Sequence, residues 1–334
     1  MSDRYLEKVK TGKFDQGLLG ISPGNWDIKS DLTFSRCSPQ NLGYHLAQRE
    51  HRVLLIDIDP QASLTKFMGV VPSQLQKTIA DAIIDEQPLP IHEGIHGMDL
   101  VPANRVLSGA EMQLVSAAMR DLRLKEAIEP VLDEYDFILI DCPPSLGLLS
   151  YISLVAATHV LVPVETHLKA FEGTDELLQT ITHVKNKANR KIQIAGFIPT
   201  RYAQQNSADK RALAAINEQL LAWGRIFPPI PRATAFVDAT EERAPLAVFD
   251  PKHSAVAILE EIALALEALW LDVSKLINPL GDKLLPNPQP LGGATRFCEV
   301  QKFCNISYLG IERSLPRKGK NREVRPGFIR NQPW

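Results

Sequence analysis

Two short apolar segments that each end in aspartate constrain the fold of this chain more than any other feature. They read VLLID at 53–57 and FILID at 137–141. Four consecutive apolar residues are typical of a strand that is covered on both faces in a parallel sheet. A carboxylate at the end of such a strand is costly to bury without a partner. We therefore expect Asp57, at the end of the first strand, and Asp59, just after it, to face water, a cation or a polar ligand.

The rest of the central sequence alternates between strand and helix patterns. Further strands are expected at 98–103, 159–165 and 192–200. Helices are expected at 41–50, 62–69, 73–85, 147–157, 170–189, 207–222 and 254–272, and one or two helices at 108–135. Helices that alternate with strands cover both faces of a parallel sheet, and ligands bind at the carboxyl ends of its strands. The pattern predicts an α/β fold with a doubly wound, mainly parallel sheet.

The two ends of the chain do not follow this pattern. Residues 1–40 contain no convincing strand, and residues 271–334 are rich in proline and glycine and become increasingly basic. Such composition is typical of segments that cannot bury a core. We expect a folded domain at 41–270 between an unmatched N-terminal segment and an irregular, disordered basic tail.

Composition and charge exclude several classes of protein. The formal net charge of −2 gives no overall attraction to nucleic acid, so any DNA binding must come from a local basic patch. The four cysteines are too few and too scattered for a disulfide framework or a zinc site. The N-terminus lacks an apolar signal core, and no run approaches the roughly 18 apolar residues that span a bilayer. We expect a cytoplasmic protein that does not enter a membrane.

Each aspartate motif has two interpretations. FILIDCPPSLG has the arrangement of a Walker B strand, whose terminal carboxylate, here Asp141, holds the Mg²⁺ of a bound nucleotide. Alternation along the first strand points Asp57 and Asp59 the same way, which favours a shared cation or an activated water. Capping of the following turn or helix explains both motifs as well. These residues alone do not decide between the two interpretations.

Four blocks taken together carry a family resemblance. They are HRVLLIDIDPQASLTKFMG, YDFILIDCPPSLGLLS, LVPVETHLKAFEGTDELLQTI and PRATAFVDATEERAPLAVFDPKHSAV, spread over about 41–268. In this order and spacing they resemble the ParA/MinD-type partition ATPases, specifically the bacterial chromosome-partitioning ParA (Soj) group. The resemblance implies a P-loop NTPase fold and an ATPase that acts in chromosome or plasmid partitioning with ATP and Mg²⁺. It also implies an ATP-dependent homodimer that binds nonspecific DNA and a ParB-type partner.

The resemblance further implies roles for individual residues. Asp59 matches the carboxylate that orients the attacking water, Asp57 lies near the metal and phosphates, and Asp141 matches the aspartate on Mg²⁺. The other implied positions are Thr200 and Arg201 at the adenine, Pro231 and Arg232 in the second base-side loop, and Lys210 and Arg211 among the DNA-binding basic residues. For any single basic residue, a solvated helix face is the alternative interpretation.

The phosphate-binding half of this implied site is not recognisable. Family members have a first strand and a loop, KGGVGKTT, whose backbone N–H groups and lysines hold the phosphates. Here no glycine lies between Gly24 and Gly43, no lysine lies between Lys29 and Lys66, and Pro39 removes one donor. Two explanations stay open: an ATPase whose gene has been disrupted, or a catalytically inactive ParA-like binding protein. We expect weak or absent MgATP binding and a gap in the sheet.

Overall fold

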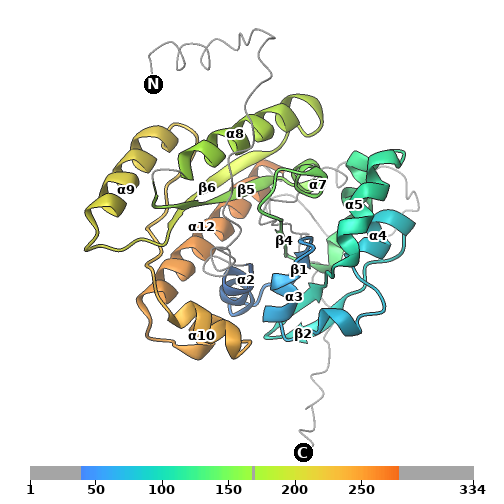
Figure 1. Cartoon of the computed structure of the whole chain (residues 1–334), viewed down its shortest axis with the longest axis horizontal. Helices are drawn as coiled ribbons and strands as arrows, with labels where there is room; N and C mark the ends of the chain where they lie inside the picture. Colours follow the sequence, from blue (N-terminus) through green and yellow to red (C-terminus); the bar gives the residue numbers. More distant parts are fainter. Residues whose placement is uncertain (1–38, 168–169, 278–334) are drawn as a thin grey trace, which may run out of the picture. The chain divides into compact units, whose positions relative to one another are not determined.

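Parallel strands form the centre of the described part of the chain, which comprises residues 39–167 and 170–277 of a computed structural model (Figure 1). All of these residues belong to one compact unit. The strands are β1 (Val53–Asp57), β2 (His92–Ile95), β3 (Met98–Val101), β4 (Phe137–Asp141), β5 (His159–Glu165) and β6 (Gln193–Thr200). β1 is parallel to β3 and β4, β5 is parallel to β6, and only β2 is antiparallel to its neighbour β3. The predicted α/β fold with a mainly parallel sheet is confirmed.

Helices surround these strands, and most of them were predicted. They are α2 (Pro39–Ala47), α3 (Ser63–Phe67), α4 (Ile79–Asp85), α5 (Val106–Ser116), α6 (Arg123–Ile128), α7 (Leu148–Ala156), α8 (Ala170–Lys187), α9 (Ser207–Leu220), α10 (Ala235–Glu241), α11 (Leu246–Phe249) and α12 (Ser254–Ile277), with short 3₁₀ helices η2 (Pro72–Gln74), η3 (Arg120–Leu122) and η4 (Glu129–Glu134). α12 continues past its predicted end at residue 272. The predictions for residues 1–38 and 278–334 lie outside the described part.

Two local features differ from the sequence prediction. The helix expected at 73–85 begins only at Ile79, because Thr78 and Asp81 form a capping box that fixes its start. β2 was not predicted; it pairs with β3 through a two-residue turn in which His96 and Gly97 both have positive φ. This turn geometry matches the twist of an antiparallel pair.

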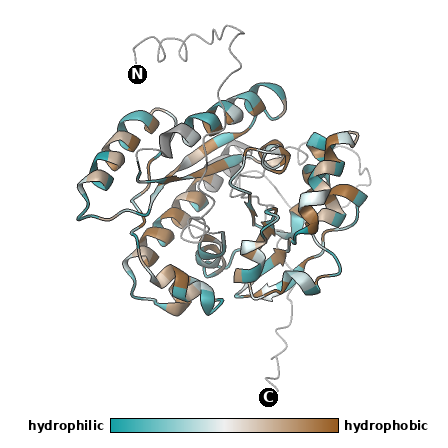
Figure 2. Ribbon diagram, in the orientation of Figure 1, coloured by the Kyte–Doolittle hydropathy of each residue, from teal (hydrophilic) through white to brown (hydrophobic). Residues whose placement is uncertain are grey.

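Both faces of the strands are buried, which explains their uninterrupted apolar sequences. Alternate strand residues enter two separate hydrophobic clusters, and the central strands are hydrophobic along their length (Figure 2). One cluster contains Leu54, Ile56, Ile138, Ile140, Val160 and Val162, and the other contains Val53, Leu55, Phe137, Leu139 and Leu161. Each cluster therefore includes residues of β1, β4 and β5.

The strands nevertheless form two sheets rather than one. One sheet has the order β2-β3-β1-β4, and the other consists of β5 and β6. Among residues 39–167 and 170–277, no strand connects β4 to β5. The two sheets share both hydrophobic clusters. The gap expected from the missing first strand concerns a segment that lies mostly outside the described residues, so it stays a prediction.

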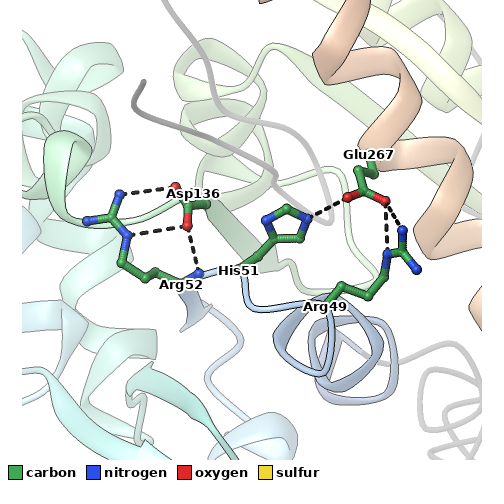
Figure 3. Close-up of polar contacts among 5 residues, drawn as sticks. All are labelled: Arg49, His51, Arg52, Asp136 and Glu267. Atoms are coloured by element: carbon green, nitrogen blue, oxygen red, sulfur yellow. Dashed lines mark hydrogen bonds and ion pairs between the residues drawn. The ribbon is translucent and has the colours of Figure 1, made fainter. Parts of the chain in front are cut away.

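Polar contacts at the amino-terminal ends of β1 and β4 join these strands to each other and to α12 (Figure 3). Glu267 on α12 accepts a hydrogen bond of 2.9 Å from Arg49 Nε, and its other oxygen lies 2.9 Å from His51 Nε2. Arg52 donates to Asp136 through its backbone N–H at 2.9 Å and through Nη2 at 3.0 Å. These contacts lie at the amino-terminal ends of the strands, so the carboxyl ends remain available for a site.

Candidate functional site

The three predicted carboxylates lie at the carboxyl ends of two adjacent strands. Asp57 and Asp141 are partners in the register of β1 and β4, and the backbone N–H of Ile58 donates to the carbonyl of Asp141 at 3.0 Å. Asp57 is fully buried and Asp141 is 6 % exposed, whereas Asp59 in the following loop is partly exposed. Asp57, which was expected with Asp59 to face water, a cation or a polar ligand, is instead enclosed by the protein.

The carboxylate of Asp57 is satisfied by the loop that follows β1. Its Oδ2 accepts hydrogen bonds from Thr65 N at 2.8 Å and Thr65 Oγ1 at 2.7 Å, and its Oδ1 accepts from Asp59 N at 3.1 Å. The Thr65 hydroxyl in turn accepts from the backbone N–H of Ala103, after β3. These hydrogen bonds attach the Asp57 carboxylate to the loop after β1 and to the first turn of α3. Asp57 thus positions the loop that carries Asp59.

Asp59 lies in the turn that this network holds. Its Oδ1 accepts from Gln61 N at 2.9 Å, and its carbonyl accepts from Ala62 N at 2.8 Å. Ala62 has a φ of 54°, in the left-handed region that costs a residue with a side chain about 1 kcal/mol. The hydrogen bonds of the turn outweigh the small conformational cost at Ala62. They keep the Asp59 carboxylate at the end of β1.

Of the three carboxylates, Asp141 has the fewest hydrogen bonds from the described residues. Its Oδ1 is buried and has no hydrogen-bond partner in that part of the chain. Burial raises the pKa of Asp141 well above its ordinary value, and the charges of Asp57 and Asp59 raise it further. Burial also raises the pKa of Asp57, to about 7, although the hydrogen bonds from Thr65 and Asp59 act in the opposite direction. An anionic Asp141 needs a cation or a donor that this part of the chain does not supply.

A magnesium ion fits this position only with help from other ligands. Mg²⁺ usually takes one or two carboxylates and completes its octahedron with water and phosphate oxygens. Within 39–167 and 170–277, no group of three or more His, Cys, Asp or Glu side chains could hold a metal ion. The orphaned oxygen of Asp141 therefore suits one ligand of such an ion, with phosphate and water as the others.

A pocket of about 450 Å³ lies at the carboxyl ends of β5 and β6. It is lined by Glu165, Thr166, His167, Arg201, Asn206, Ala208, Asp209 and Arg232. Two of these residues, Arg201 and Arg232, belong to the two loops that the sequence placed at a nucleotide base. Tyr202 joins these loops, because its N–H donates to Ile230 O at 3.1 Å and its carbonyl accepts from Arg232 N at 2.9 Å. The structure thus brings the two predicted loops together.

The pocket contains both signs of charge. Arg201 Nη1 lies 3.7 Å from Glu165 Oε1, and Arg201 has a φ of 58°, so its backbone is strained where β6 ends. Thr200, just before it, is 1 % exposed, and within the described residues its Oγ1 has no hydrogen-bond partner. A planar ligand with donors and acceptors on its edge suits these groups.

Sequence reasoning missed several residues of this pocket. Glu165 is the last residue of β5, as Asp57 and Asp141 are the last residues of β1 and β4. Its position in the sequence could therefore have identified it. Asn206 caps α9 by accepting from Ala208 N, and Asp209 accepts from Ala203 N and from Asn206 Nδ2, each at 2.8 Å. The spacing of Asn206 and Asp209 at a helix start was a second signal. These contacts fix the loop after β6.

The predicted DNA-binding residues lie outside the pocket. Lys210 and Arg211 are exposed in the first half of α9. Arg225 pairs with Glu261 at 3.0 Å and lies over the ring of Phe227, so its charge is already matched. Across the described helices, none is long and apolar enough to cross a membrane.

A family model described as an AAA domain matches residues 37–194. The sporulation initiation inhibitor protein Soj of Bacillus subtilis is 32 % identical over 227 residues, which cover 67 % of this chain and 89 % of Soj. The chromosome partitioning protein ParA of Caulobacter vibrioides is 33 % identical over 218 residues, which cover 64 % of this chain and 81 % of that ParA.

Two solved structures have similar folds. One is a cobyrinic acid a,c-diamide synthase from Mycobacterium smegmatis with a bound ATP analog and magnesium. It has a TM-score of 0.63 and 29 % identity, and the match covers 72 % of this chain and 91 % of the synthase chain. The ATP complex of an aspartate-to-alanine variant of Cyanothece McdA has a TM-score of 0.65 and 25 % identity, and the match covers 71 % of this chain and 93 % of the McdA chain. The chain has the P-loop NTPase type of fold and belongs to the ParA/Soj family of partition ATPases.

Proposed function

We propose that this chain acts in the partitioning of chromosomal or plasmid DNA, as a ParA-type protein that dimerises, binds nonspecific DNA and meets a ParB-type partner. The relatives named Soj and ParA support this role. Lys210 and Arg211, exposed on α9, supply a local basic surface despite the net charge of −2. Such residues bind phosphates without reading sequence.

The nucleotide part of the proposal rests on one observation, the pocket that joins Arg201 and Arg232 at the ends of β5 and β6. A pocket of about 450 Å³ with a buried hydroxyl and charged groups on its walls suits a nucleotide base. Asp141 would then hold Mg²⁺ through one oxygen, and Asp59 would orient a water molecule. Bound Mg²⁺ neutralises negative charge on phosphate oxygens. Asp57 would keep the Asp59 loop in place.

The phosphate contacts decide how tightly this site binds. The sequence before α2 contains no motif like KGGVGKTT, and each charge-assisted hydrogen bond contributes roughly 1.5 to 3 kcal/mol. Loss of two such bonds weakens binding by roughly 10² to 10⁴-fold, since about 1.4 kcal/mol corresponds to tenfold. The three carboxylates also repel a nucleotide when no cation lies between them. We therefore assign to this chain a ParA-type binding role with very weak MgATP affinity and no measurable hydrolysis.

The second candidate function is that of an ordinary partition ATPase, which the names of the relatives favour. Calorimetry with MgATP and a phosphate-release assay on the full chain separate the two. We expect no saturation at micromolar MgATP and no phosphate release above that of a boiled sample. Micromolar affinity would refute the weak-binding role and indicate a phosphate-binding loop of unexpected sequence in residues 1–40.

A graft provides the matched positive control. Replacement of residues 1–40 by a family strand and KGGVGKTT loop should restore hydrolysis, because it adds the missing phosphate donors to the carboxylates already present. In that graft, Asp59→Ala should abolish turnover but leave ATP binding intact. A graft that binds ATP but stays inactive with Asp59 present would contradict the assignment of the water-orienting role to this residue.

A further inference from the structure

The helix that follows the Asp141 loop is held by a side chain from a distant part of the chain. Glu111 Oε1 on α5 accepts a hydrogen bond of 3.0 Å from the backbone N–H of Leu148, the first residue of α7. α5 and α7 contact each other, and Leu114 and Leu149 place them in the same hydrophobic cluster (Figure 1). The carboxylate therefore reaches α7 from a helix that is itself anchored in the core.

α7 has no cap of its own, although the first N–H groups of a helix need acceptors. Its N-cap residue is Gly147, which has no side chain, and its first turn contains no acidic residue. A helix N-terminus favours a negative charge, because the aligned peptide dipoles place a partial positive charge there. Glu111 supplies both the missing acceptor and the missing charge.

Gly147 leaves room for this carboxylate. A Cβ atom at Gly147 would lie 2.7 Å from Glu111 Oε1, which is closer than the two atoms can approach. The φ of Gly147 is −77° and its ψ is −169°, an extended conformation that any residue adopts. The approach of the carboxylate therefore explains the glycine, and the backbone conformation does not. An alanine at this position would displace the flexible end of Glu111.

The loop 142–147, which links Asp141 to α7, is tied to this helix. Ser150 Oγ on α7 donates to Ser145 O at 2.6 Å. The thiol of Cys142, the first residue of the loop, is buried. The loop and α7 are therefore held together, so a contact that fixes α7 also fixes the loop.

We propose that Glu111 is a positioning residue for Asp141: its carboxylate closes the N-terminus of α7 and so fixes the loop 142–147 beside the Asp141 side chain. This inference rests on the proposed function in one respect, the role of Asp141 as a magnesium ligand. Glu111 acts through the loop and not on the ion. A shift of α5 would therefore reach the neighbourhood of Asp141.

The thiol of Cys142 reports on this loop, and the assay needs neither nucleotide nor magnesium. Alkylation of the full chain by iodoacetamide, resolved by peptide mass spectrometry, gives the rate at Cys142 separately from the other cysteines. Glu111→Ala should raise this rate about tenfold, because local opening exposes the thiol more often. Glu111→Gln keeps an acceptor for the Leu148 N–H and should return the rate to within about twofold of wild type. Gln113→Ala changes an exposed residue of the same helix and is the matched control, with no expected effect.

A double variant separates positioning from general destabilisation. Gly147→Ala displaces the same carboxylate and should also raise the rate, by about fivefold. Because both changes break one contact, the double variant should react no more than about twofold faster than Glu111→Ala alone.

Three results would overturn the proposal. They are a wild-type rate in Glu111→Ala, an equally fast reaction in Glu111→Gln and Glu111→Ala, and a double variant in which the two single effects multiply. Failure of the proposed nucleotide role would appear in the MgATP calorimetry and would leave these alkylation rates unchanged.

Discussion

Replacement of Asp141 by asparagine should stabilise this protein, although the residue is the implied magnesium ligand. The Asp141 carboxylate is 6 % exposed, and its Oδ1 lacks a partner among the described residues. Asparagine has the same shape without the charge, and its amide can donate toward the neighbouring aspartates. The variant therefore removes repulsion with Asp57 and Asp59 as well as the cost of desolvating a third carboxylate.

The magnitude follows from the cost of an unsatisfied buried group, about 1 to 3 kcal/mol. We expect Asp141→Asn to raise the free energy of unfolding by about 2 kcal/mol at pH 8. With a urea dependence of about 2 kcal/mol per molar, the unfolding midpoint moves up by about 1 M. EDTA is present throughout, so that no cation compensates the wild-type carboxylate.

The effect should depend on pH in a defined direction. The folded-state pKa of Asp141 is raised above its unfolded value, so the folded wild type holds this proton more tightly. Wild-type stability therefore falls as pH rises between the two pKa values, whereas the asparagine does not titrate. The advantage of the variant should grow from pH 5 to pH 8.

Urea unfolding followed by circular dichroism at both pH values measures this difference. Asp238→Asn is the matched control, because Asp238 is an exposed carboxylate on α10, and it should shift the midpoint little at either pH. A variant at Asp141 that is no more stable than wild type at pH 8 would mean that the carboxylate has a favourable partner, and the reasoning from its isolation would fail.

Three further predictions concern other contacts. Thr65→Ala removes a hydroxyl that donates to Asp57 and accepts from Ala103 N. It should lower the free energy of unfolding, measured by urea titration, by about 2 kcal/mol. Thr65→Ser keeps the hydroxyl and should restore most of the lost stability. Burial alone would raise the pKa of Glu267, but the hydrogen bonds from His51 and Arg49 outweigh this effect and lower it. Glu267→Gln should therefore be less stable than wild type at pH 7. The difference in stability should shrink as pH falls through the lowered pKa of Glu267. An unchanged difference at acid pH would show that the charge of Glu267 is not what holds α12. Reversal of Lys210 and Arg211 to glutamate should weaken binding to any DNA sequence about equally and reduce the slope of log K against log salt by about 2, and an unchanged slope would move the DNA site elsewhere.

Much of the fold and part of the site could be predicted from local patterns. The strands 53–57 and 137–141 have the predicted bounds, because four apolar residues followed by aspartate leave little freedom in where a buried strand ends. The carboxyl ends of parallel strands share one edge of a sheet, so Asp57 and Asp141 were expected to be near each other, and the register pairs them.

The sequence by itself determined the order of the elements and the edge at which chemistry would lie, because those depend on periodicity within a few residues. Only the tertiary structure decided which carboxylate has hydrogen-bond donors. Asp57 accepts hydrogen bonds from Thr65, whose hydroxyl accepts one from the backbone N–H of Ala103, after another strand. It also decided that two loops close around a pocket containing Arg201 and Arg232, and that β4 and β5 share their cores without pairing. Those features depend on contacts between residues far apart in the chain, and no local pattern encodes their distances.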